Sequence, residues 1–423
     1  MGLFFGGWLG LVFLNMPVAF ALGVAAVAYL VIQGAPMSNA PQRLIAGLDS
    51  FPLLAVPFFI LAGHLMNNGG VSERIYGFAR TLVGHIRGGL GHVNVIGSLI
   101  FSGMSGSAVA DAGGLGVLEI KAMRDDGYPD SFSGPLTCAS CIIGPLVPPS
   151  IPMVLYAVIA NVSLGGLFLG GVVPGFLTAF ALMVMVYVMA RRRGYPAHPR
   201  ATLRQCWHAF RRAFLALVTP AIIMAGIFGG IFTPTEAAAV AALYALAIGV
   251  VAYRSLGWGD ILRAFRETVE TTAVVGLIVA AANLFGWILA RERVPQMVAE
   301  LFLDISAEPQ VVLLVINLLL LALGCVMEGT ALLILLVPML APLTAQLGID
   351  PVHFGVVVIM NLMIGILTPP FGVGLFVVSR AADIPFGVLA RGIVPFLVPL
   401  LIVQATITFV PSTVLFLPRL FGF

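Results

Sequence analysis

Long apolar runs constrain the fold of this 423-residue chain more than any other feature of its sequence. Hydrophobic residues make up 60% of the chain and charged residues only 9%, whereas an ordinary soluble domain carries roughly 25% charge. A helix needs about 20 apolar residues to cross the hydrocarbon core of a bilayer. The composition therefore excludes a water-soluble enzyme, and we expect an all-α protein that crosses a lipid bilayer many times.

Short polar loops separate the apolar runs and predict ten spans and two hairpins. The regions 90–123 and 310–345 are interrupted halfway by small or polar residues, as in re-entrant hairpins that enter the membrane and return. The amphipathic segments 72–87 and 291–304 are typical of helices that lie at a membrane surface, and each would lead into a hairpin. The predicted spans are 2–15, 17–34, 51–68, 131–160, 164–190, 213–232, 236–253, 271–290, 355–379 and 393–417.

Arginine placement predicts the orientation of the chain. Seven arginines fall in the predicted loop 191–212, which the positive-inside rule assigns to the cytoplasm. Both termini then face the periplasmic side. The net charge of +3 offers no basic surface for nucleic acid, so no nucleic-acid partner is expected.

A short motif occurs twice. Residues 144–149 read GPLVPP and residues 365–370 read GILTPP, and the same offset places Gly103 on Gly324. The order of elements also repeats, which indicates a duplication. An odd number of crossings separates the two motifs, so the copies are inverted. Because each proline pair removes helix hydrogen bonds, the motifs predict discontinuous helices, the pattern of an inverted-repeat secondary transporter.

The repeat divides the chain into five parts. They are the first-repeat scaffold helices and surface arm at 1–87, the first transport unit at 88–190, the cytoplasmic Arg-rich loop at 191–212, the second-repeat scaffold helices and arm at 213–305, and the second transport unit at 306–423.

The interrupted segments are candidate ion sites. A broken helix exposes backbone carbonyls, and these, with nearby hydroxyls, suit an alkali cation such as Na⁺ held by neutral oxygens without a fixed carboxylate. The alternative is that these small residues only allow close helix packing. The candidate Na⁺ ligands are Ser105, Ser107, Gly144, Val147, Pro149, Gly324, Thr330, Gly365, Thr368 and Pro370.

The hairpin tips are candidate substrate sites, because helix N-termini present free N–H groups to an anion. Asp111 and Glu328 lie at membrane depth, where a charge is costly and usually functional, although either carboxylate could serve structural hydrogen bonding. The candidate substrate residues are Gly106, Ser107, Asp111, Glu328, Gly329 and Thr330.

Other reactive side chains are interpreted as structural. Cys138 and Cys141 form a C-x-x-C without a second metal-binding motif, so we expect packing. His64 could relay protons, but a lone histidine near a span end is more often a packing residue. Glu236 follows Thr233-Pro234-Thr235 and predicts a capping box. No catalytic residue and no cofactor other than a coupling ion is expected.

Several segments together resemble a known family. They are Gly63–Met66, Gly84–Leu90, Ser105–Ala112, Pro148–Ile151, Pro174–Gly175, Pro234–Ala239, Gly348–Gly355 and Thr368–Gly372. In order along the chain, they are similar to the large membrane subunit of the tripartite ATP-independent periplasmic (TRAP) transporters. Glu328 stands where that family pattern leads us to expect Asp.

This resemblance implies Na⁺-driven import of a small organic acid across the bacterial inner membrane. It also implies two partners, a small four-helix membrane subunit and a soluble periplasmic substrate-binding protein. Both hairpins and both broken helices would form a mobile domain that works as an elevator. The resemblance leaves open which organic acid is carried.

Two alternatives differ in function. A symporter of similar fold would take its carboxylate directly from the medium, without a binding protein. An intramembrane enzyme would use His64, Glu328 or the Cys138/Cys141 pair, but these residues show no catalytic motif spacing.

Overall fold

The computed structural model describes residues 2–14, 16–370 and 372–423, and the regular structure in these ranges is entirely helical. The first half contains α1 (Gly2–Phe13), α2 (Val18–Ile32), α3 (Asn39–Leu48), η1 (Phe51–Leu54), α4 (Ala55–Asn68), α5 (Val71–Val83), α6 (Gly89–Ser105), α7 (Ala108–Gly113), α8 (Leu115–Asp125), α9 (Asp130–Cys141), α10 (Ile151–Ala160) and α11 (Leu164–Arg193). The second half contains α12 (Leu203–Phe228), α13 (Pro234–Ala247), η2 (Ile248–Ala252), α14 (Trp258–Arg291), α15 (Val294–Ile305), α16 (Pro309–Gly324), α17 (Gly329–Gln346), α18 (Pro351–Gly365), α19 (Val373–Ala382), α20 (Phe386–Gly392), α21 (Val394–Phe409) and α22 (Ser412–Leu420).

Both predicted helix breaks are present. Helix α9 ends at Cys141 and α10 begins at Ile151, while α18 ends at Gly365 and α19 begins at Val373. The prolines of each motif lie in these gaps, and the Pro148–Pro149 and Pro369–Pro370 bonds are cis. The predicted spans 131–160 and 355–379 are therefore each two short helices.

Several predicted boundaries are wrong. Within the described ranges, six segments are long and apolar enough to cross a bilayer alone, and two bent helix pairs raise this to eight. Helix α12 begins at Leu203 and α14 at Trp258, well before the predicted starts at 213 and 271. Of the predicted loop 191–212, residues 194–202 alone separate two helices. Hydropathy detects only the apolar part of a helix, so it misses the charged turns that continue the helix into water.

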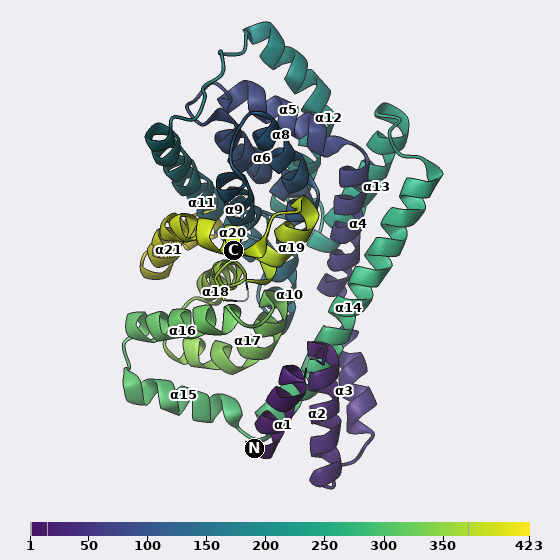
Figure 1. The fold of residues 1–423 in the computed structure, drawn as a ribbon. Helices are drawn as coiled ribbons and strands as arrows, with labels where there is room; N and C mark the ends of the chain where they lie inside the picture. The colour runs from purple at the N-terminus through teal and green to yellow at the C-terminus, as the bar shows by residue number, and fades with distance from the viewer. Residues whose placement is uncertain (1, 15, 371) are drawn as a thin grey trace.

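Helix α14 is the longest element and joins the outer helices. Its 34 residues extend about 51 Å at 1.5 Å per residue, more than the hydrocarbon thickness. It packs against α2, α3 and α4, and α4 in turn packs against α13 (Figure 1). We call α2, α3, α4, α12, α13 and α14 the outer helices.

The two repeats interlock at the centre of the molecule. In the first repeat, α6 and α8 pack on α9, and in the second, α16 and α17 pack on α18. After each break the chain crosses to the other repeat, since α10 packs on α17 and α19 packs on α7 and α8. The hydroxyl of Tyr156 in α10 donates a 2.8 Å hydrogen bond to the carbonyl of Pro351. Helices α6–α10 and α16–α19 thus form one central unit.

The two amphipathic arms support an inverted relationship between the repeats. Helices α5 and α15 follow α4 and α14 in the chain, and they lie at opposite ends of the molecule (Figure 1). The chain bends by 115° between α15 and α16. Each arm therefore leads from an outer helix into the central unit, as the sequence predicts, but from opposite ends.

Candidate functional site

A cavity of about 610 Å³ lies between the central unit and the outer helices. Its walls come from α4, α14, the turn between α6 and α7, and the start of α17. Both hairpin turns therefore face one space, although more than 200 residues separate them in the chain. The polar residues at its wall include His64, Asn67, Asn68, Ser105, Ser107, Glu267, Thr271, Glu328 and Thr330.

The first hairpin turn lies directly against the first helix break. Gly106 adopts φ +62°, and a Cβ there would lie 2.5 Å from the carbonyl oxygen of Pro149. The N–H of Ile151 donates a 3.2 Å hydrogen bond to the carbonyl of Gly106. Ser107 caps α7, where its Oγ accepts from the N–H of Ala110 at 3.4 Å. The sequence-predicted Gly106, Ser107 and Pro149 are thus brought together.

Asp111 lies behind this turn and not at the cavity wall. Its side chain is buried, and its Oδ1 accepts a hydrogen bond from the hydroxyl of Ser105. Its Oδ2 is buried without a hydrogen-bond partner in the described residues. A Cβ on Gly144 would lie 2.6 Å from that oxygen. The first break therefore faces a carboxylate, which differs from the expectation of neutral oxygens alone.

The second hairpin turn is built differently. Glu328 caps α17, where its Oε2 accepts from the N–H of Ala331 at 2.8 Å. Its side chain is exposed and faces the cavity, as does Thr330, whereas Gly329 is buried against Met363. The N-terminus of α17 is thus already capped by the carboxylate of Glu328.

The remaining predicted ion ligands lie away from the cavity wall. Gly324 and Gly365 pack backbone to backbone, since a Cβ on Gly324 would lie 2.9 Å from the Cα of Gly365. The hydroxyl of Thr368 donates to the carbonyl of Ile364 at 2.8 Å. Val147 contacts α11, and Pro370 is exposed. Among the described residues of the second break, Ile366 alone lines the cavity.

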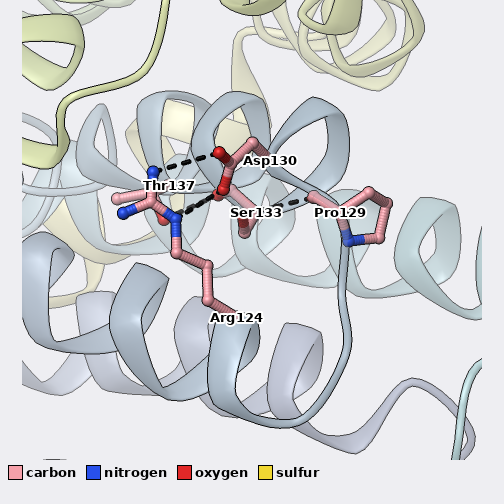
Figure 2. A network of polar contacts seen from close by, with 5 residues as sticks. All are labelled: Arg124, Pro129, Asp130, Ser133 and Thr137. Carbon is pink, nitrogen blue, oxygen red and sulfur yellow. Dashed lines mark hydrogen bonds and ion pairs between the residues drawn. The ribbon is translucent and has the colours of Figure 1, made fainter.

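A buried polar network in the first repeat was not predicted from the sequence. Asn94 donates to Glu119 at 2.6 Å and to the hydroxyl of Thr137 at 2.8 Å. The sequence did contain a signal for this network, because Glu119 is a charged residue inside the predicted apolar hairpin 90–123. The network continues along α9, where Thr137 donates to the carbonyl of Ser133 at 2.9 Å, and it approaches the Arg124–Asp130 ion pair at the start of that helix (Figure 2).

The side chains of His64 and Glu267 meet at the cavity wall. The Nδ1 of His64 lies 3.2 Å from a carboxylate oxygen of Glu267, so the histidine faces the cavity and is not a packing residue. Glu267 lies four residues before the predicted span 271–290 and was missed for that reason. The pair joins α4 to α14 on the outer-helix side of the cavity.

The other reactive residues lie away from the cavity. Cys138 and Cys141 are buried free thiols away from the cavity. The described ranges contain no cluster of three or more His, Cys, Asp or Glu side chains that could hold a metal ion. The Thr233–Glu236 capping box is confirmed, with the N–H of Thr233 donating to Glu236 at 2.8 Å.

Comparison with known proteins identifies a family. Residues 5–413 match the family described as tripartite ATP-independent periplasmic transporter, DctM component. The sialic acid TRAP transporter large permease protein SiaM of Vibrio cholerae is 58% identical over 98% of this chain and 97% of its own length. The sialic acid TRAP transporter permease protein SiaT of Haemophilus influenzae is 48% identical over 98% of this chain and 67% of its own.

Two further similarities are more distant. The C4-dicarboxylate TRAP transporter large permease protein DctM of Pseudomonas aeruginosa is 39% identical over 90% of this chain and 89% of its own length. The crystal structure of the Alcanivorax borkumensis YdaH transporter superposes with a TM-score of 0.61 and 16% identity over 86% of each chain. At that identity the superposition shows a shared fold.

Proposed function

This chain belongs to the DctM family of TRAP transporters, and on that premise we propose that it imports a sialic-acid-type sugar acid together with Na⁺. Like its relatives, it is a multi-pass inner-membrane permease and not an enzyme. The cavity between both hairpin turns and the outer helices carries the proposal. The relatives named for sialic acid are more similar over this chain than the relative named for C4-dicarboxylates.

The cavity offers groups for a polar, hydroxylated cargo. Hydroxyls and amides at its wall, such as Ser107, Thr330 and Asn67, can exchange hydrogen bonds with a sugar acid. Glu267 on the outer-helix side and Glu328 on the central-unit side also line the cavity and repel a carboxylate. A coupled cation would offset that repulsion, which gives the Na⁺ a physical role beyond its gradient.

We propose that the first Na⁺ lies beside Asp111. The sequence instead predicts that Asp111 contacts the cargo. The unpartnered Oδ2 of Asp111 lies next to Gly144. The carbonyl of Gly144 has no helix partner four residues on, because Pro148 lacks an N–H. A buried carboxylate is stable as an anion only when a positive charge accompanies it. Ser105 orients that carboxylate.

The transport assay tests this assignment. The permease with its proposed small subunit and periplasmic binding protein, in proteoliposomes, should take up sialic acid under an inward Na⁺ gradient and not take up succinate. Asp111→Asn, Ser107→Ala and Thr368→Ala should raise the half-saturating Na⁺ concentration, with Asp111→Asn having the largest effect. Unchanged Na⁺ titrations would contradict the ion sites, and uptake without the binding protein would favour a standalone symporter.

We further propose an elevator mechanism, in which the central unit moves against the outer helices. Two features support this: the unit interlocks both repeats, and small residues line its boundary, where the Cβ of a residue replacing Gly63 would lie 3.8 Å from the Cβ of Ser105. Replacing Pro148 and Pro149 by Ala should abolish uptake while leaving membrane insertion intact, because a continuous helix would close the first break.

A further inference from the structure

A second groove, larger than the cavity, lies between α5 and the start of α12. Its volume is about 740 Å³. Four arginines and one glutamate line it, so the arginine charge exceeds the acidic charge. The charged lining residues are Glu73, Arg74, Arg204, Arg211 and Arg212, with His208 among them.

The arginines of α12 are available to a ligand. Arg204 and Arg211 lie on the same face of α12 at i and i+7, with His208 between them at i+4. Arg204, Arg211 and Arg212 are exposed, and none makes an ion pair within residues 2–14, 16–370 and 372–423. Arg74 is different, because its guanidinium lies 3.8 Å from the ring centre of Tyr253 and donates to the carbonyl of Gly70 at 2.6 Å.

Apolar side chains beside the groove indicate its depth in the membrane. Trp207 lines the groove with 66% of its surface exposed, and Leu203 is 91% exposed. The apolar part of α12 begins directly after Arg212, so the groove lies at the level where that helix leaves the hydrocarbon. Tryptophan is enriched at this level, and the arginines mark it as the cytoplasmic side.

We propose that this groove binds the headgroup of an anionic phospholipid of the cytoplasmic leaflet. The guanidiniums would hold the phosphate, since arginine forms charge-assisted, often bidentate hydrogen bonds with phosphate oxygens. Trp207 would contact the glycerol and upper acyl region, which a free phosphate lacks. Bound lipid would brace α5 against α12, two elements on the outer-helix side of the molecule.

The test measures thermal stabilisation of the purified full chain by defined probes. Dihexanoyl-phosphatidylglycerol should raise the unfolding midpoint in a saturable way, whereas dihexanoyl-phosphatidylcholine and inorganic phosphate should not. The R204Q/R211Q/R212Q variant should need about tenfold or more phosphatidylglycerol for half-saturation, because each basic group near a lipid surface contributes independently. Size-exclusion chromatography and circular dichroism would confirm that this variant is folded.

A matched control separates a site from general attraction. R191Q/R192Q/R193Q removes the same charge nearby, at the end of α11 and outside the groove, and it should keep the wild-type half-saturation. Trp207→Ala should weaken phosphatidylglycerol binding without creating a response to phosphate. Equal losses in the two triple variants, equal stabilisation by inorganic phosphate, or binding only of an acidic peptide such as hepta-glutamate would each overturn the proposal.

Discussion

The hydroxyl of Ser140 donates a hydrogen bond of 2.7 Å to the side-chain oxygen of Asn94. Asn361 makes the corresponding bond in the second repeat, donating to Asn317 at 2.7 Å. Both bonds join the first helix of a hairpin to the helix before a break, and all four residues are buried. The duplicated fold thus keeps one polar clamp per repeat, built from different side chains.

The first clamp predicts a stability effect. Asn94→Leu removes the donor to Glu119 and Thr137, so it should lower the free energy of unfolding by about 1–3 kcal/mol, the cost of buried groups left unpaired. The measurement is the thermal midpoint in detergent. Ser98→Ala removes only a 3.0 Å bond to Ser140 and should cost less. Equal losses would mean that the network contributes little.

The glycine contact at the second break predicts a strict size limit. Gly365→Ala would place a Cβ 2.8 Å from the Cα of Gly324, which neither backbone can accommodate without separating α16 from α18. We expect loss of both stability and uptake. Gly387→Ala is the matched control, because a Cβ there meets nothing within 4 Å. A fully active Gly365→Ala protein would contradict the close packing.

Cross-linking tests the proposed movement. In a background with the four native cysteines replaced, Gly63→Cys with Ser105→Cys would place two Cβ atoms 3.8 Å apart, a distance that suits a disulfide. Oxidation should stop uptake, and reduction should restore the rate of the unoxidised double variant. Gly23→Cys with Ala281→Cys, at 4.0 Å between outer helices, should cross-link without stopping uptake. Continued uptake with Gly63 and Ser105 joined would exclude the elevator.

The capping box predicts a structural effect without a functional one. Thr233→Ala removes the hydroxyl that accepts from the N–H of Glu236 and should cost about 1 kcal/mol. Glu236→Gln keeps an oxygen that can accept from the N–H of Thr233, so it should leave the thermal midpoint nearly unchanged. Uptake per folded molecule should not change at any pH. A shifted pH profile would instead make Glu236 a proton carrier.

The Arg124–Asp130 pair predicts a small, pH-independent contribution. Arg124 donates two hydrogen bonds of 2.5 and 3.1 Å to the carboxylate of Asp130, and these bonds raise the pKa of Arg124. A base whose pKa is raised on folding contributes stability that is fully present below its ordinary pKa. That stability is lost only as pH rises through the raised pKa. Because arginine is fully protonated well above pH 9, Arg124 adds no pH dependence between about pH 6 and 9. Asp130→Asn should cost at most about 1 kcal/mol, as for exposed pairs. A double-mutant cycle with Arg124→Gln measures this coupling.

The sequence by itself determined the architecture. Apolar runs of span length, the repeated GPLVPP and GILTPP motifs and the two amphipathic arms predict an inverted all-helical membrane protein with paired helix breaks. These signals are local, because each depends on the composition of a short window or on the backbone chemistry of proline. The Thr233–Glu236 cap was readable for the same reason.

Only the tertiary structure decided which residues meet. The sequence treats Asp111 and Gly144 as separate sites, yet they are neighbours, and Glu267 becomes a cavity residue only because α14 passes His64. Glu328 is a cap as well as a cavity residue. Contacts of this kind depend on how helices cross after each break, and the side-chain pattern of a single helix does not record its neighbours.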